Sequence, residues 1–146
     1  MPTEEFGRSV TVAATAARVF AHLAHPDNYV GLAPLVVAVR DVTTLPDEVR
    51  YVAVERFRFG SLRWDNPIRV SMTFPAAGHR IVSEVRSPGG VRLTATVQLT
   101  GVPEGTRVCE TVRVVCPRPL RPFVVGQAAQ AQRHRLAELA RRMGRP

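Results

Sequence analysis

The residues best placed for chemistry are polar side chains that alternate with apolar ones in segments typical of β-strands. Strand alternation puts the following polar residues on the same face as their apolar neighbours: Glu55, Asn66, Arg80, Glu84 and Glu110. A buried carboxylate is costly unless it is paired. These groups therefore contact one another, contact a ligand, or lie in water at a strand end. As structural residues, Glu84 and Glu110 would be ion-pair partners of Arg80 or of an arginine at the rim.

Other reactive side chains are poorly placed for catalysis or metal binding. His22 and His25 lie three residues apart on a predicted helix, without a third ligand at a suitable spacing. Cys109 and Cys116 lie seven apart on one predicted strand, about 23 Å at strand rise, too far to form a disulfide. Neither a phosphate-binding loop nor a nucleophilic serine motif occurs. We expect no metal and no cofactor, and a reducing, cytoplasmic compartment.

The composition predicts one globular domain spanning residues 1–146. We recognise no signal peptide and expect no stable membrane insertion. All 20 basic residues are arginine, and the net charge is +8. Because these arginines are scattered along the chain, we expect no nucleic-acid partner. We expect a monomer or a homodimer. The alternative is an acidic partner on an outer sheet face that carries Arg50, Arg56, Arg58, Arg63, Arg69, Arg92, Arg107 and Arg113.

A long C-terminal helix over residues 118–143 is the strongest single element. Apolar residues recur there at a three-to-four spacing, the period of one helix face, and include Ala128, Leu136 and Met143. Arg133, Arg135, Arg141 and Arg142 fall largely off that stripe. A helix of this length needs a large apolar surface to pack on.

The residues before that helix predict a sheet that supplies such a surface. A strand over residues 6–13 precedes a helix over 16–24, capped by Thr15, and a short helical segment ends near Ala33. Six strands follow, over the ranges 35–42, 49–59, 62–74, 79–87, 91–100 and 106–116. Gly60-Ser61 predicts a tight hairpin that pairs Phe57 with Trp64. A long antiparallel sheet covered by one helix must curl around it, which leaves a concave apolar space.

Three segments of the chain resemble the START/Bet v 1-like (SRPBCC) helix-grip superfamily, in particular its bacterial polyketide cyclase/dehydrase-type members. They are the strand-cap-helix run VAATAARVFAHL over residues 12–23, the sequence HPDNY over 25–29, and GTRV over 105–108, followed by the long C-terminal helix. The resemblance implies an α+β helix-grip fold, a curved seven-stranded antiparallel sheet around that helix. It also implies a cavity between sheet and helix.

We therefore expect the chain to bind a hydrophobic small molecule, such as a lipid, a polyketide or an aromatic metabolite. Strand parity predicts the strand residues of the ligand site, and Phe123 and Gln127 should border its opening because Gly126 and two prolines loosen the start of the helix. The predicted ligand-binding residues are Tyr51, Phe57, Trp64, Asn66, Val70, Met72, Leu93, Val97, Phe123 and Gln127. The identity of the ligand is not encoded in any motif.

The alternative function is a polyketide cyclase, aromatase or dehydratase acting in the same cavity. Its candidate catalytic residues are Arg69, Glu84, Glu110 and Tyr51. Aromatase/cyclase relatives resemble one another in an aromatic, a small hydroxyl residue and an arginine at alternating inward positions of a central strand. Trp64 and Asn66 occupy the first two places, whereas Ile68 takes the third and Arg69 follows one residue late. A bulge at Pro67 would turn Arg69 inward.

Overall fold

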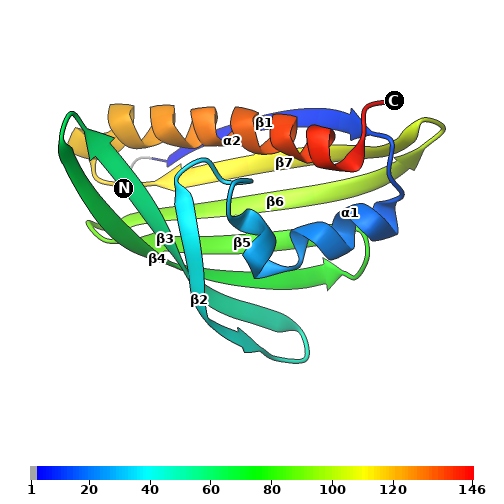
Figure 1. The fold of residues 1–146 in the computed structure, drawn as a ribbon, viewed down its shortest axis with the longest axis horizontal. Coiled ribbons are helices and arrows are strands. Elements are labelled where there is room, and N and C mark those ends of the chain that lie inside the picture. The colour runs from blue at the N-terminus through cyan, green and yellow to red at the C-terminus, as the bar shows by residue number, and fades with distance from the viewer. Residues whose placement is uncertain (1–2) are drawn as a thin grey trace.

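The computed structural model describes residues 3–146, which form seven strands, two α-helices and two 3-10 turns (Figure 1). In chain order the elements are β1 (Thr3–Val12), α1 (Ala16–Leu23), η1 (Pro26–Tyr29), β2 (Val36–Thr44), β3 (Glu48–Phe59), β4 (Leu62–Ala76), β5 (Arg80–Ser87), β6 (Val91–Val102), β7 (Gly105–Val115), η2 (Arg118–Leu120) and α2 (Arg121–Met143). The predicted order of elements is confirmed. The long helix begins three residues later than predicted, because 118–120 form a separate 3-10 turn beside Pro119 and Pro122.

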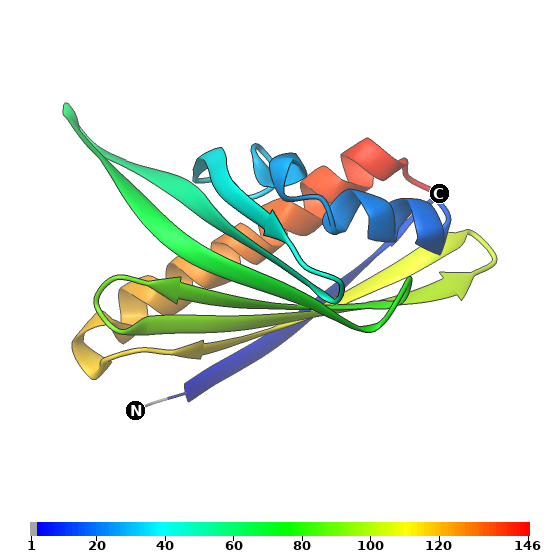
Figure 2. The same cartoon turned by 90° about the horizontal axis from the view of Figure 1, so that it is seen from below.

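All seven strands join one antiparallel sheet in the order β1-β7-β6-β5-β4-β3-β2. The strands β2 to β7 thus form a meander, and β1 adds to it beside β7. The predicted hairpin register is confirmed, with Phe59 opposite Leu62 and Phe57 opposite Trp64. Gly60 in the turn has φ 58°, a conformation that glycine adopts without steric cost. The sheet curves around α2, which lies along its concave side (Figures 1 and 2).

The main hydrophobic core lies at one end of α2. The C-terminal half of the helix contributes Leu136, Leu139 and Met143, and α1 contributes Val19 and Leu23. Thr15 caps α1 as predicted, because its Oγ1 accepts a hydrogen bond from the Arg18 backbone N at 3.3 Å. Within residues 3–146, no helix is long and apolar enough to cross a membrane. A smaller buried cluster lies under the other half of α2 and comprises Val91, Val112, Val114, Cys116 and Ala128.

Gly105 and Thr106 hold the end of β1 against the start of β7. A Cβ on Gly105 would lie 2.1 Å from the Val12 carbonyl oxygen, so only glycine fits this close approach. The neighbouring Thr106 is fully buried, and its Oγ1 donates to the Ala14 carbonyl at 2.8 Å. These two contacts fix the chain between β1 and α1.

The predicted side-chain direction of β5 is wrong. Sequence alternation placed Arg80 and Glu84 on the inner face, but both side chains are exposed. Pairing with β4 sets Ser83 opposite the buried Met72, so the odd-numbered residues of β5, from Ile81 to Ser87, face inward. The inner positions of β5 therefore include two serines, which gave no apolar signal in the sequence.

Candidate functional site

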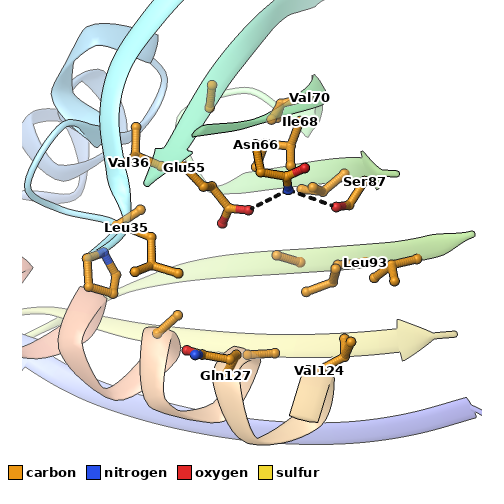
Figure 3. Close-up of a pocket in the computed structure, with 18 of the residues that line it drawn as sticks. Leu35, Val36, Glu55, Asn66, Ile68, Val70, Ser87, Leu93, Val124 and Gln127 are labelled. Carbon is orange, nitrogen blue, oxygen red and sulfur yellow. Dashed lines mark hydrogen bonds between the residues drawn. The ribbon is translucent and has the colours of Figure 1, made fainter. Parts of the chain in front are cut away.

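A cavity of about 390 Å³ lies between the concave face of the sheet and the N-terminal half of α2 (Figure 3). The strand residues on its walls are Tyr51, Ala53, Glu55, Phe57, Trp64, Asn66, Ile68, Val70, Ser83, Val85, Ser87, Val91, Leu93, Ala95, Val97, Glu110 and Val112. The segments around β2 contribute Tyr29, Ala33, Pro34, Leu35 and Val36, and the β5–β6 turn and the helical segments contribute Pro88, Leu120, Phe123, Val124, Gln127, Ala128, Ala131 and Arg135.

Short side chains on both sides of this space explain why it is hollow. Ala131 on α2 and Ser83 and Ala95 on the sheet all line the cavity, and none reaches far across it. In the main core, by contrast, longer side chains such as Leu136 and Leu139 fill the same interval between helix and sheet. The sequence thus packs one end of the helix and leaves the other end open.

The cavity opens between the β3–β4 hairpin and the start of α2. Trp64, Leu120 and Phe123 line the cavity and are also exposed, by 48%, 40% and 51%. The Trp64 ring stacks between Phe57 and Phe59, with ring centroids 5.4 Å and 5.1 Å away. The entrance is therefore lined by aromatic and aliphatic side chains.

One wall of the cavity carries a polar chain of three side chains. Asn66 Nδ2 donates to Glu55 Oε1 at 3.5 Å and to Ser87 Oγ at 3.3 Å (Figure 3). Burial raises the pKa of the Glu55 carboxyl, and the Asn66 hydrogen bond only partly opposes that effect. Glu55 makes no ion pair with any residue of the described chain. This carboxyl is thus held in the cavity with an increased tendency to keep its proton.

A second polar group joins β7 to α2. Arg135 Nε donates to Glu110 Oε2 at 3.0 Å, and Arg135 Nη2 donates to the other carboxylate oxygen. Burial acts to lower the pKa of Arg135, but the charge and hydrogen bonds of Glu110 outweigh it, so that this pKa is raised. Both residues line the cavity, and their opposite charges neutralise each other there.

Tyr51 and Tyr29 lie near this ion pair. Their rings are 6.3 Å apart, and both line the cavity. Tyr29 donates its hydroxyl proton to the Leu23 carbonyl at 2.7 Å. Burial raises the pKa of both phenols, which keeps them protonated as hydrogen-bond donors.

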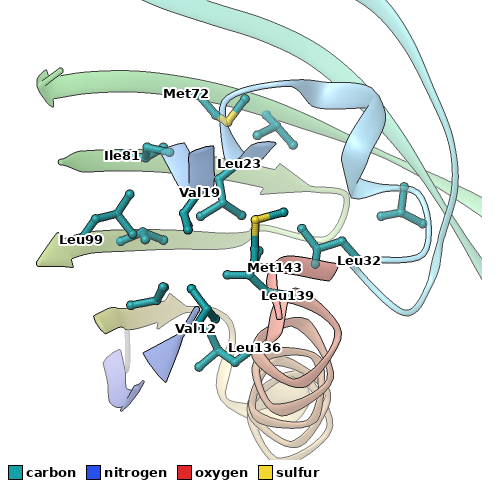
Figure 4. Close-up of a cluster of buried hydrophobic side chains, with 14 of the residues drawn as sticks. Val12, Val19, Leu23, Leu32, Met72, Ile81, Leu99, Leu136, Leu139 and Met143 are labelled. Carbon is teal, nitrogen blue, oxygen red and sulfur yellow. The ribbon is translucent and has the colours of Figure 1, made fainter. Parts of the chain in front are cut away.

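Nine of the ten predicted ligand-binding residues line the cavity, and their binding of a ligand stays a prediction. The residues on its walls are Tyr51, Phe57, Trp64, Asn66, Val70, Leu93, Val97, Phe123 and Gln127. Met72 is the exception, because β4 has already reached the main core at this position. Its side chain is fully buried beside α1 (Figure 4).

The four candidate catalytic residues separate into two pairs. Tyr51 and Glu110 line the cavity, whereas Arg69 and Glu84 are exposed on the outer face of the sheet. The bulge that would turn Arg69 inward is absent from residues 48–73, because the pairing of β3 with β4 runs there without a shift. Glu84 points outward because the inner face of β5 is formed by Ile81, Ser83, Val85 and Ser87.

Sequence reasoning left Arg135 and Ser87 out of the site. Arg135 was placed largely off the apolar stripe of the helix, yet it follows Ala128 and Ala131 at helical spacing and reaches the cavity with them. The spacing of Arg135 from Ala128 and Ala131 could therefore have predicted its position at the cavity. Ser87 was missed because the inner face of β5 was assigned to the opposite parity.

The described part of the chain contains no group of three histidine, cysteine or acidic side chains that could hold a metal ion. His22 Nε2 lies 3.2 Å from Nη1 of Arg142, a cationic neighbour that disfavours a metal there. Cys109 and Cys116 are both free thiols.

Comparisons with known proteins identify a family and a fold. The family model described as polyketide cyclase/dehydrase and lipid transport matches residues 3–144. No curated protein matches the chain significantly.

Among solved structures, the Zhui aromatase/cyclase from Streptomyces sp. R1128 superposes with a TM-score of 0.81 at 14% identity, covering 97% of this chain and 94% of that one. A START superfamily protein from Mycobacterium smegmatis gives 0.74 at 15% identity, covering 95% and 96%. The di-domain aromatase/cyclase BexL from the BE-7585A biosynthetic pathway gives 0.76 at 21% identity, over 99% of this chain and 51% of BexL. At these identities the likeness establishes the helix-grip fold.

Proposed function

The chain belongs to the polyketide cyclase/dehydrase and lipid transport family, and we propose that its cavity binds an uncharged, mostly apolar small molecule. Lipids, polyketides and aromatic metabolites are the ligand classes of this kind. One observation carries the proposal, a cavity of about 390 Å³ whose walls are apolar except for a few hydrogen-bonding groups. Binding pockets for small molecules commonly have about 300–1,000 Å³ and walls of this composition.

The charges in the cavity favour a neutral ligand. Glu110 and Arg135 already satisfy each other, so neither offers a free charge to a ligand. Burial raises the pKa of Glu55, which favours its uncharged form. A charged ligand would lose its hydration without gaining a counter-ion, which is costly in an apolar cavity.

Two polar positions would orient such a ligand. The Glu55–Asn66–Ser87 chain lies on one wall, and Arg135 contacts the Glu110 carboxylate close to Tyr51. A ligand with hydrogen-bonding oxygens at two places and an apolar body between them matches this distribution. Trp64 and Phe123 at the entrance would contact its outer part.

Titration of the protein with lipids and polycyclic aromatic compounds tests this proposal through Trp64, the one tryptophan of the chain. We expect a change in Trp64 fluorescence that saturates. Ala131→Phe places a ring into the cavity and should abolish that change. Ala137→Phe, at an exposed position of the same helix, is the matched control and should retain it. Equal binding by both variants, or no saturable binding of either compound class, would overturn the proposal.

A second candidate function is catalysis of a cyclisation or dehydration in the same cavity. The observation that favours it is the Glu55 carboxyl, which lies in the cavity with a raised pKa and a fixed orientation from Asn66. A carboxyl with a pKa nearer neutrality is suited to moving a proton at a carbonyl compound. Tyr51 is a hydrogen-bond donor in the same cavity.

Glu55→Gln separates the two functions. If the protein only binds its ligand, the variant should retain the fluorescence titration, and neither protein should convert a poly-β-ketone test substrate. If Glu55 transfers a proton, the wild type should cyclise or dehydrate the substrate, and the variant should bind it with at least 100-fold slower turnover, on the order of general acid–base effects. Product analysis by mass spectrometry measures both.

A further inference from the structure

The end of the molecule at which the cavity opens is built from three segments that are distant in the chain. They are the β3–β4 turn at Gly60-Ser61, the β5–β6 turn at 88–90, and η2. The latter two are adjacent, because a Cβ on Gly89 would lie 3.9 Å from Leu120 Cδ1. In Figure 2 the β3–β4 hairpin extends away from these two segments.

Exposed apolar side chains gather at this end. Five of the nine large hydrophobic residues that the described chain exposes are found here: Phe59, Leu62, Trp64, Leu120 and Phe123. Phe59 and Leu62, which flank the hairpin turn, are 52% and 69% exposed and do not line the cavity. Ligand binding inside the cavity therefore does not account for these two side chains. A cluster of exposed apolar residues of this kind indicates an interaction surface.

Arginines without an ion pair in the described chain lie one position behind these apolar residues along the strands, with their side chains on the opposite face of the sheet. Arg58 lies opposite Arg63 next to the β3–β4 turn, and Arg86 lies opposite Arg92 next to the β5–β6 turn. Arg118 is on η2. Among residues 3–146, none of these five makes an ion pair. Like charges placed directly opposite each other on neighbouring strands destabilise a sheet, so these pairs bring the fold itself no benefit.

Nearby carboxylates offset only part of this charge, although Asp65 lies near Arg58 and Arg63 and Glu5 is exposed on β1 opposite Arg113. Asp65 on β4 pairs with Arg56 at 2.9 Å, and Glu4 on β1 pairs with Arg121. Glu104 lies in the β6–β7 turn. This turn is at the opposite end of β6 from the β5–β6 turn and therefore far from the cavity opening. The open end of the cavity is therefore the positively charged end of these strands.

We propose that this surface docks onto a lipid bilayer that contains anionic phospholipids. The mouth surface comprises Phe59, Leu62, Trp64, Leu120 and Phe123 together with Arg58, Arg63, Arg86, Arg92 and Arg118. The apolar side chains at the turn enter the boundary of the acyl chains, and the arginines one position behind them contact the lipid phosphates. Docking brings the open end of the cavity against the bilayer. The inference that the cavity takes its ligand directly from the membrane rests on the proposed function.

The order of apolar and charged groups favours a bilayer over a nucleic acid or an acidic protein. A bilayer presents an apolar layer beneath a layer of negative phosphates, and the hairpin presents Phe59 and Leu62 beyond Arg58 and Arg63. A partner that offers negative charge alone would leave the exposed Leu62 without an apolar contact.

Co-sedimentation with phosphatidylcholine vesicles, with and without phosphatidylglycerol, tests docking. We expect the wild type to bind only vesicles that contain phosphatidylglycerol, less tightly as salt rises, with a blue shift of Trp64 emission. Each arginine near an anionic surface is worth about fivefold in affinity, so Arg58→Gln/Arg63→Gln should weaken binding about 30-fold. The matched control Arg18→Gln/Arg107→Gln removes two exposed arginines elsewhere and should bind within about threefold of the wild type.

A second variant tests the apolar part of the surface. Phe59→Ser/Leu62→Ser should lose vesicle binding and keep the circular dichroism spectrum of the wild type, because both side chains are exposed. No binding to anionic vesicles, equal binding by the two arginine variants, or binding to DNA or an acidic polypeptide with none to vesicles would overturn the proposal. Ala131→Phe distinguishes docking from ligand binding, since it should bind vesicles like the wild type even though its cavity is filled.

Discussion

Glu110 on β7 and Arg135 on α2 form a two-point ion pair on the wall of the cavity, in which the guanidinium donates to both carboxylate oxygens. The carboxylate is 4% exposed and the arginine side chain 17%. Gln132, one turn earlier on α2, donates to the backbone carbonyl of Glu110 at 3.1 Å. Glu110 therefore holds α2 against the sheet through both its carboxylate and its backbone carbonyl, and it places a charged group on the cavity wall.

Loss of Arg135 should destabilise the protein more than loss of the whole pair. Arg135→Ala leaves a buried carboxylate without a partner, which we expect to cost about 3–5 kcal/mol of the free energy of unfolding. Glu110→Gln/Arg135→Met removes both charges and should recover most of that loss. Urea unfolding followed by circular dichroism measures both variants. Equal destabilisation by the single and double variants would contradict a role for the unpaired charge.

Burial of Glu55 predicts a distinct pH dependence of stability. The carboxyl loses its proton near pH 4.5 in the unfolded chain and only at higher pH in the folded protein, because burial raises its pKa. Between these two values the unfolded state binds fewer protons, so the free energy of unfolding falls as the pH rises. Glu55→Gln removes this contribution, and the variant should gain stability relative to the wild type across that interval.

Thermal melts of the wild type and Glu55→Gln from about pH 4 to about pH 8 measure this difference. Glu84→Gln removes a carboxylate from the exposed outer face and serves as the matched control for the exchange. A constant difference in Tm between Glu55→Gln and the wild type over the whole range would show that Glu55 does not titrate differently in the two states.

The two halves of α2 should respond differently to truncation of a side chain. Leu136 is buried in the main core, where Leu→Ala costs roughly 2–5 kcal/mol. Phe123 is half exposed at the cavity entrance, so Phe123→Ala should weaken ligand binding and leave Tm nearly unchanged. Thermal melting and ligand titration of both variants test this. An unchanged Tm for Leu136→Ala would be incompatible with α2 packing as described.

Gly105 should be irreplaceable, unlike the nearby Gly101. A Cβ at Gly105 would meet the Val12 carbonyl oxygen at 2.1 Å, and its φ of 145° disfavours other residues. We expect Gly105→Ala to cost at least about 1–3 kcal/mol. A Cβ at Gly101 would meet no atom within 4 Å, and Gly101→Ala should stay within about 0.5 kcal/mol of the wild type. Similar melting temperatures for the two variants would contradict this explanation of the Gly105 contact.

The sequence by itself determined the elements and the register of the main hairpin. Strand and helix periods depend only on neighbouring residues, so they can be read from the chain. The two-residue turn at Gly60-Ser61 fixes the register of the hairpin, in which Phe57 pairs with Trp64. The burial of Leu136 followed from the helix period, and the position of Phe123 at the cavity followed from its place near the start of the helix, beside two prolines and Gly126.

The tertiary structure alone decided which polar residues share the cavity. The direction of β5 depends on its pairing with β4, and a face that tolerates Ser83 and Ser87 carries too little apolar signal to be read locally. Arg135 and Glu110 are 25 residues apart, and only the curvature of the sheet around α2 brings them into contact. Arg69 likewise points to the outer face only because β3 and β4 pair without a bulge before it. A bulge in β4 would have turned its side chain toward the cavity.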